Sequence, residues 1–313
     1  MVNDEALSNL GSSNQHFFPK MIIKHTKFIL CSFLLFSCVQ LYGQKTGYGS
    51  STTEHTIISN EGNQYKLKVT LPAGYNLSES YKTLYYLDAW WLSELVLGSY
   101  AILNLTNSVE DVVLVGISLD GSELDWNTQR NRDFTPSAYD INKMGFQLKG
   151  GSGENGVDLT PETTGKANAF SEFLNNKVFK FIENKYSNIT EIRGLIGHSF
   201  GGLFGVYSMQ NHLEMFNDLI LISPSAWWNK SELLDETRFS SFNNLNRDTK
   251  IHLSYGGAES RLITASNQSL NLILNGLKNE NFNFKFEAYE NKNHHSVLSR
   301  AIYDGLLFLY GKD

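Results

Sequence analysis

Cysteine is nearly absent from this chain of 313 residues. The two cysteines, Cys31 and Cys38, lie within the first 43 residues, so residues 44–313 contain no thiol. A disulfide, a cysteine nucleophile and a cysteine-ligated zinc site are therefore excluded from that part of the chain. Basic residues are also scarce, with 26 Lys and Arg against 32 Asp and Glu and a net charge of −6. This balance argues against nucleic acid as a partner, because phosphate binding needs a basic face.

A long membrane-spanning segment is missing as well. The apolar run at residues 28–39 is shorter than the roughly 20 residues that a membrane-spanning helix needs. A short basic stretch at residues 21–27 precedes it and a small residue, Gly43, lies beyond it, as is typical of a secretory signal peptide. We therefore expect an N-terminal extension and signal peptide over residues 1–43, with Met21 as an alternative start. A buried N-terminal helix is the other interpretation.

The predicted signal peptide indicates a secreted or periplasmic protein whose mature chain begins at Gln44. The stretch Leu35-Phe36-Ser37-Cys38 loosely resembles a lipoprotein cleavage box, although phenylalanine at its second position fits poorly. A lipid on Cys38 is thus the alternative to free secretion. It is the one membrane association that the sequence suggests.

Residues 44–313 have no internal repeat and no low-complexity linker, so we expect a single domain. Strands and helices alternate along it, which predicts an α/β fold with a mostly parallel sheet and helices on both faces. Strands are expected at residues 64–71, 83–87, 112–117, 194–196, 219–222, 251–254 and 282–289, and helices at residues 92–105, 167–186, 203–210, 261–277 and 297–310. Residues 44–54 are expected to be a mobile N-terminus. Residues 118–165 are expected to be a long loop that covers the pocket and sets selectivity.

The sharpest chemical signal is Gly197-His198-Ser199-Phe200-Gly201, a G-x-S-x-G pattern between an expected strand and an expected helix. Such a turn holds the serine in a strained conformation at a helix N-terminus, and the glycines let neighbouring backbone approach. Ser199 is therefore the predicted nucleophile. An ordinary glycine-rich turn is the alternative.

A serine nucleophile needs a base and a carboxylate, which follow it in the order acid, then histidine, in α/β-hydrolases. His252 lies within an expected strand and suits a structural role, so His294 and His295 are the candidate bases. The pattern alone does not choose between them, and a metal site at this pair would need a third ligand. Glu259 follows the strand at residues 251–254 and is the candidate acid.

An oxyanion hole requires two backbone N–H groups. Phe200, directly after the nucleophile, is expected to supply one. Ala89 or Trp90, after the strand at residues 83–87, is expected to supply the other. Asp88 is more suited to shaping that turn than to chemistry.

Several strings together resemble the esterase family of α/β-hydrolases that includes esterase D-like proteins and siderophore esterases such as those for ferri-bacillibactin and enterobactin. The strings are the Gly197–Gly202 elbow, Leu87-Asp88, Arg130-Asn131-Arg132-Asp133-Phe134-Thr135-Pro136, Ser223-Pro224-Ser225-Ala226-Trp227-Trp228 and the His-x-Ser-Val at 294–297. The resemblance spans residues 54–311 and is nearest to the siderophore-esterase branch. It implies an α/β-hydrolase fold, Ser199 as nucleophile, Glu259 as acid and His294 rather than His295 as base.

The same resemblance brings four candidate substrate-binding residues to attention. Trp227 and Trp228 follow the strand after the elbow helix, with core packing as the alternative. Arg130 and Arg132 are candidates for an anionic substrate group, with a salt bridge as the alternative. Ala89 departs from the family, where glycine is frequent at that position.

These observations predict a secreted serine esterase with a Ser-His-Glu triad that needs no metal and no organic cofactor. The expected substrate is a small-molecule or glycan ester, either a siderophore lactone or an acylated glycan. An acyltransferase with the same triad and a non-catalytic binding protein on a hydrolase scaffold are the alternatives. The sequence does not indicate an oligomeric state.

Overall fold

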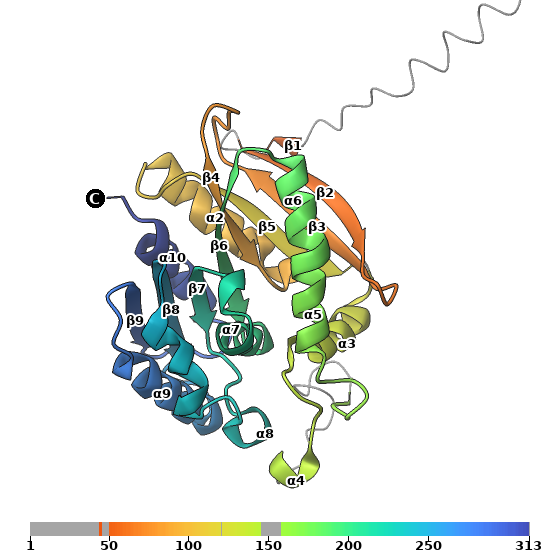
Figure 1. Ribbon diagram of the computed structural model, residues 1–313, viewed down its shortest axis with the longest axis vertical. Coiled ribbons are helices and arrows are strands. Elements are labelled where there is room, and N and C mark those ends of the chain that lie inside the picture. The colour runs from red at the N-terminus through yellow and green to blue at the C-terminus, as the bar shows by residue number, and fades with distance from the viewer. Residues whose placement is uncertain (1–43, 46–49, 120, 145–157, 313) are drawn as a thin grey trace, which may run out of the picture. The chain divides into compact units, whose positions relative to one another are not determined.

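A nine-stranded mixed sheet organises the described part of the chain (Figure 1). The computed structural model describes residues 44–45, 50–119, 121–144 and 158–312. The predicted signal peptide, with Cys31 and Cys38, lies outside these residues. The strands are β1 (Gln44–Lys45), β2 (Ser51–Ile58), β3 (Gln64–Leu71), β4 (Tyr81–Tyr86), β5 (Val112–Leu119), β6 (Ile189–His198), β7 (Asp218–Ile222), β8 (Thr249–Gly256) and β9 (Phe282–Tyr289).

The strand order is β1-β2-β3-β5-β4-β6-β7-β8-β9. In the run β5-β4-β6-β7-β8-β9 every neighbouring pair is parallel. The pairs β1–β2, β2–β3 and β3–β5 are antiparallel. The predicted mostly parallel sheet is therefore confirmed. Because all carboxyl ends of the parallel run meet at one edge, the loops after β6, β7, β8 and β9 can converge there.

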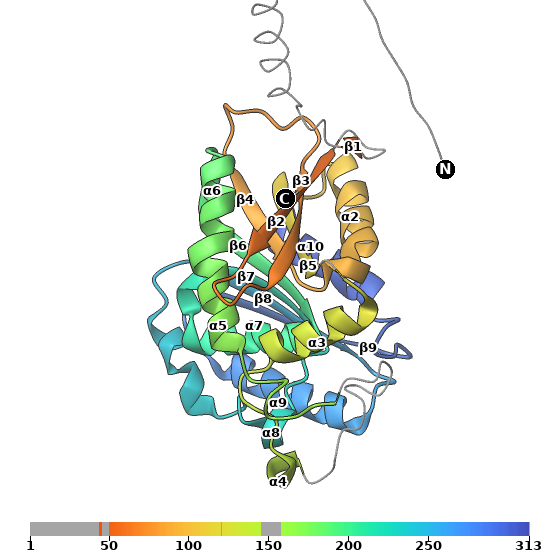
Figure 2. The ribbon, with the colours of Figure 1, turned by 90° about the vertical axis from the view of Figure 1, so that its right-hand side faces the viewer.

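Helices cover both faces of this sheet, as the alternation of strands and helices predicts. The helices are α2 (Ala89–Leu105), α3 (Glu123–Phe134), α4 (Ile141–Met144), α5 (Ala167–Phe173), the π-helical turn η1 (Leu174–Phe179), α6 (Lys180–Lys185), α7 (Phe200–Asn211), the short 3₁₀ helix η2 (Leu213–Met215), α8 (Trp228–Ser231), the 3₁₀ segment η3 (Glu236–Asn244), α9 (Arg261–Gly276) and α10 (Leu298–Tyr310). Figure 2 shows the sheet between α6 on one side and α2 on the other.

The period of two along the central strands decides which helices each side chain meets. In β7, Leu219 and Leu221 join the core beneath α5, α7 and α9, whereas Ile220 and Ile222 join the core beneath α2 and α10. All four side chains are almost fully buried. Both faces of the central sheet are thus apolar, as parallel strands require.

Two polar stretches are more ordered than the sequence predicts. Residues 51–58, partly within the expected mobile N-terminus, form β2, which pairs along its whole length with β3. The expected loop at residues 118–165 contains α3 and α4, and its residues 145–157 lie outside the described part. A capping box begins α3: Ser122 Oγ accepts from Asp125 N–H, and the Asp125 carboxylate accepts from Ser122 N–H at 2.9 Å. None of the described helices has both the length and the apolar character needed to span a bilayer.

Candidate active site

Ser199 occupies the sharp turn between β6 and α7. Its backbone has φ 57° and ψ −115°, a strained conformation for a residue with a side chain. The turn is held by Ser199 N–H, which donates to the carbonyl of Ile222 at 3.0 Å. A Cβ on Gly197 would lie 2.3 Å from the carbonyl oxygen of Gly201, so only glycine fits there. The elbow predicted from the sequence is therefore present.

His294 and Glu259 form a tight pair in the loops that follow β9 and β8. The distance from His294 Nδ1 to Glu259 Oε2 is 2.6 Å, and the Glu259 side chain is fully buried. A carboxylate can only accept, so Nδ1 carries the proton and Nε2 of a neutral ring keeps its lone pair. That lone pair is what a general base needs. The neighbouring His295 instead stacks edge-on against Trp91, with its ring centroid at 6.0 Å.

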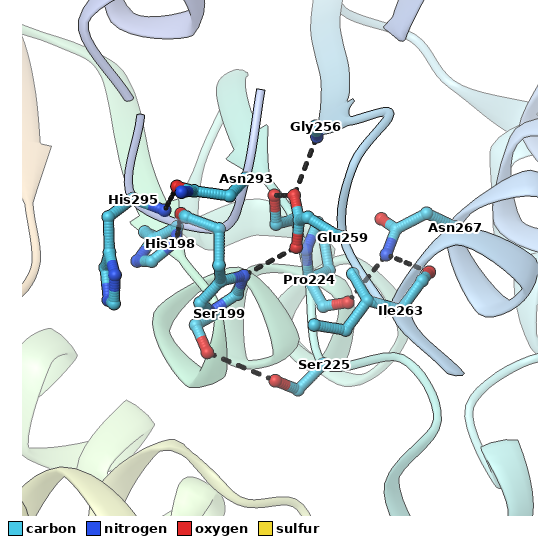
Figure 3. Close-up of polar contacts among 12 residues, drawn as sticks. His198, Ser199, Pro224, Ser225, Gly256, Glu259, Ile263, Asn267, Asn293 and His295 are labelled. Carbon is cyan, nitrogen blue, oxygen red and sulfur yellow. Dashed lines mark hydrogen bonds and ion pairs between the residues drawn. The ribbon is translucent and has the colours of Figure 1, made fainter. Parts of the chain in front are cut away.

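The second carboxylate oxygen of Glu259 is also occupied (Figure 3). Glu259 Oε1 accepts from Ser223 Oγ at 2.5 Å and from Gly256 N–H at 2.7 Å. Burial by itself raises the pKa of Glu259, but these bonds and the one from His294 outweigh it. The pKa is held below its ordinary value of 4.5. The acid is therefore ionised at neutral pH.

Ser199 points its hydroxyl toward Ser225 (Figure 3). The two Oγ atoms are 3.3 Å apart, and among the described residues this is the hydrogen bond of the Ser199 side chain. Catalytic hydrogen bonds are often long or open in the absence of substrate. Ser199, His294 and Glu259 nonetheless line one cavity.

The two predicted oxyanion segments lie against each other. Phe200 begins α7, and Ala89 and Trp90 begin α2, so their N–H groups lack acceptors within their helices. A Cβ on Gly201, in the first turn of α7, would lie only 3.5 Å from the Asp88 carboxylate. Both helix N-termini therefore approach the nucleophile from neighbouring positions, where they favour negative charge.

Arg130 is held in a buried ion pair beneath this turn. Its Nε and Nη2 atoms reach the two Asp88 oxygens at 3.1 Å each, and Trp126 Nε1 donates to Asp88 Oδ1 at 3.1 Å. Asp88 itself has φ 56° at the N-cap of α2. The sequence predicts that Asp88 shapes the turn, and this network is how it does so. The salt-bridge alternative for Arg130 is thus realised, although Arg130 still borders the cavity.

Two candidate substrate-binding residues lie away from the cavity. Arg132 forms an ion pair with Asp133 at 2.7 Å and donates to Tyr65 Oη at 3.3 Å. Trp228 is fully buried, and its Nε1 donates to the carbonyl of Ser137 at 3.2 Å. Trp227, by contrast, borders the cavity. In each pair of neighbouring candidates, one residue borders the cavity and the other does not.

The cavity above Ser199 has a volume of about 640 Å³. Aromatic rings form much of one side: Trp90 stacks on Trp126 with centroids 5.5 Å apart, and Trp126 meets Trp91 edge-on. The Trp90 side is open, because this residue is 45% exposed. Among the described residues, no group of three or more His, Cys, Asp or Glu is arranged to hold a metal ion.

His198 contributes to the site, a role that the sequence analysis missed. Its Nε2 donates to the carbonyl of His294 at 2.9 Å, which ties the loop of the base to the elbow. Burial, helped by the nearby His294 and Arg130, lowers the pKa of His198 well below its ordinary value, so the ring is neutral. The position directly before Ser199 was the available signal. His252, in contrast, contacts Glu287 at 3.2 Å from within β8, as its strand position suggests.

A family comparison gives this geometry its context. The model of the family described as "Putative esterase" matches residues 59–300, which is most of the chain. The chain belongs to this esterase family. This family agrees with the esterase class that the sequence predicts.

Curated relatives in this family include bacterial and fungal enzymes. The ferri-bacillibactin esterase BesA of Bacillus subtilis is 27% identical over 263 residues, covering 81% of this chain and 87% of that one. The siderophore triacetylfusarinine C esterase of Aspergillus fumigatus is 29% identical over 130 residues, covering 38% of this chain and 44% of that one. The match to the siderophore enterobactin esterase of Emericella nidulans covers 26% of that enzyme. The chain thus spans less than half the length of the two fungal relatives.

Solved structures share the fold over most of their length. The BES protein from Bacillus cereus is 25% identical with a TM-score of 0.73, covering 83% of this chain and 96% of that chain. The enterobactin and salmochelin hydrolase IroE is 20% identical with a TM-score of 0.62, covering 85% of this chain and 97% of that chain. The predicted α/β-hydrolase fold is confirmed.

Proposed function

We propose that this esterase cleaves carboxylic esters through an acyl-enzyme on Ser199, with His294 as base and Glu259 as acid. The observation that carries the proposal is the 2.6 Å bond from His294 Nδ1 to the buried Glu259 carboxylate, beside a cavity that also contains Ser199. This bond leaves Nε2 as the nitrogen of His294 that can accept the Ser199 proton.

In the proposed mechanism, His294 Nε2 takes the Ser199 proton while Oγ attacks the ester carbonyl carbon. The N–H groups of Phe200 and of Ala89 or Trp90 stabilise the oxyanion. His294 then gives its proton to the departing alcohol. Water attacks the acyl-enzyme with His294 again as base, and the proton returns to Ser199 Oγ as the acid product leaves.

We propose a siderophore ester as the substrate class, with an acylated glycan as the competing one. Three relatives are named as esterases of triacetylfusarinine C, enterobactin and ferri-bacillibactin, which supports the first class. A cavity of about 640 Å³ is the size that accommodates a small-molecule substrate. We further propose that residues 44–313 act as a single secreted or periplasmic domain after removal of residues 1–43, or remain on a membrane through a lipid on Cys38.

The test uses residues 44–313 with short-chain p-nitrophenyl esters, beside the Ser199→Ala variant. We expect hydrolysis by the wild type and a loss of about 10⁴-fold or more in the variant, because the nucleophile is gone. Full activity in the variant would contradict the proposed nucleophile. Ferric siderophore esters and acetylated or feruloylated oligosaccharides, compared by kcat/KM, then separate the two substrate classes. An acylated sugar formed when a sugar acceptor is added would indicate acyl transfer. A wild-type protein that hydrolyses none of the esters and does not react with a fluorophosphonate would indicate a non-catalytic binding protein.

A further inference from the structure

A second hydroxyl lies beside the proposed nucleophile. Ser225 Oγ is 3.3 Å from Ser199 Oγ, and Ser225 is only 2% exposed where it borders the cavity. It belongs to the string Ser223-Pro224-Ser225 in the loop after β7. The proposed triad and oxyanion hole give this residue no role.

Backbone hydrogen bonds fix the position of this loop. Ser223 N–H donates to the carbonyl of Ser254 at 2.7 Å, which continues the pairing of β7 with β8. Ser225 N–H donates to the carbonyl of Ser199 at 3.0 Å. The two serines are therefore tied together by their backbones as well as by their side chains.

Contacts from two helices hold the same loop from other sides (Figure 3). Asn267 on α9 is fully buried, and its Nδ2 donates to the carbonyl of Pro224 at 2.9 Å. On α7, Gly202 lies so near that a Cβ there would be 3.0 Å from Pro224 Cα. The Ser225 hydroxyl is thus held in place before any substrate arrives, which is the condition for a useful catalytic donor.

The number of protons on the Ser199 and Ser225 hydroxyls decides which of the two donates the hydrogen bond between them. Each serine hydroxyl has one proton and two lone pairs. When Ser199 donates its proton to His294, Ser199 Oγ can only accept from Ser225. Among the described residues, Ser225 Oγ has no other hydrogen-bond partner, so its proton is available for this bond.

We propose that Ser225 is a further catalytic residue, whose hydroxyl donates a hydrogen bond to Ser199 Oγ; this inference rests on the proposed function of Ser199. As the Ser199 proton moves to His294 Nε2, the bond from Ser225 stabilises the negative charge that develops on Oγ before the O–C bond forms. In deacylation the same bond stabilises Oγ as the O–C bond breaks and the proton returns from His294. The Ser225 proton stays on Ser225 throughout.

The test compares the Ser225→Ala and Ser225→Thr variants with the wild type, on p-nitrophenyl acetate and on a fluorophosphonate probe. A hydrogen bond to a charged group is worth enough to change a rate about 10- to 100-fold. We expect Ser225→Ala to lower kcat, and the rate of covalent labelling, by about that factor, with KM unchanged. Ser225→Thr keeps the hydroxyl and should recover most of both rates.

The control is Ser208→Ala, which removes a hydroxyl that is 99% buried within α7 and bonded to the Gly205 carbonyl at 2.8 Å. It should label at the wild-type rate. The final labelled fraction of each variant gives the folded fraction. A Ser225→Ala protein that labels at the wild-type rate, whether to full or to reduced extent, overturns the proposal. If Ser199→Ala stays active, the proposed function fails instead.

Discussion

The two sides of the cavity are built on opposite principles. The floor, which comprises Ser199, Ser225, Glu259 and His294 with the buried Ser223 behind Glu259, is polar, and each of these side chains has a hydrogen-bond partner within 3.3 Å. The aromatic wall, which comprises Trp90, Trp91 and Trp126, is held mainly by ring packing, and Trp90 is 45% exposed. The difference suggests that the floor fixes the chemistry and the wall adapts to the substrate.

The largest effect should follow from a change in the floor that preserves shape. In Glu259→Gln, the amide nitrogen would face His294 Nδ1, so the ring would take the tautomer with its proton on Nε2. Such a histidine cannot act as a base, and the corresponding acid-to-amide change in serine proteases lowers kcat about 10⁴-fold. We expect a loss on the order of 10³ to 10⁴ in kcat on p-nitrophenyl acetate, with KM little changed. A loss smaller than tenfold would remove Glu259 from the triad.

The Glu259→Gln variant also tests whether the charge on Glu259 stabilises the fold. The pKa of Glu259 lies below its ordinary value when the protein is folded. Ionised Glu259 therefore stabilises the fold above about pH 4.5, and this contribution disappears as the pH falls through the folded-state pKa. As the pH falls from 7 to 3, the wild type should lose unfolding free energy relative to Glu259→Gln. Urea titration of both proteins at each pH measures this difference. A difference that is constant with pH would contradict the lowered pKa.

A large effect of another kind is expected beneath the wall. Asp88→Asn leaves the Arg130 guanidinium buried without its counter-charge, since both side chains are at most 8% exposed. Breaking a buried pair from one side costs about 3–5 kcal/mol of unfolding free energy. Asp125→Asn, which alters the exposed capping box of α3, serves as the matched control and should lower the unfolding free energy much less. Equal losses in the two variants, measured by chemical denaturation, would show that the pair is not a structural anchor.

The smallest effect should come from the wall itself. Trp90→Ala removes the open ring that stacks on Trp126, and aromatic contacts of this kind contribute about 0.5–1.5 kcal/mol. We therefore expect kcat/KM for an aryl ester to fall about 2- to 12-fold, mainly through KM. Trp90→Phe should recover part of the lost kcat/KM. If kcat falls as strongly as in Glu259→Gln, the division between floor and wall is wrong.

The sequence brings Ser199, Glu259 and His294 of the floor to attention because these residues come from turns with strong local rules. Ser199 lies in a glycine pattern that only a strand–helix elbow needs, and Glu259 and His294 follow strands whose apolar runs are plain. The choice of His294 over His295 came from family resemblance. It is the geometry that pairs His294 with Glu259 at 2.6 Å. That pairing depends on the loop after β9, which no local pattern specifies.

The aromatic wall and the Asp88–Arg130 ion pair beneath it were harder to predict, because they depend on the side of the helix on which each residue lies. Arg130 and Arg132 are two positions apart on α3, so they point to different sides of the helix, one to Asp88 and one to Asp133. Helix α3 was not predicted, because its polar sequence has no clear helical spacing of apolar residues. The capping box at Ser122 was the readable signal. Strand β2 was missed for a similar reason, because its polar, threonine-rich start resembles a loop.

The position of α10 has a consequence for how the chain reaches its working state. Tyr310, near the end of α10, is buried in the core that also contains Leu84 and Ile196, and Gly311 bridges to Val109. Helix α2 covers part of this face of the sheet, and the part beneath α10 stays uncovered until residues 298–310 have been synthesised. Contacts of such long sequence separation make folding slow. His294 lies just before α10 in the sequence, so the proposed base is also synthesised long after the elbow serine, Ser199.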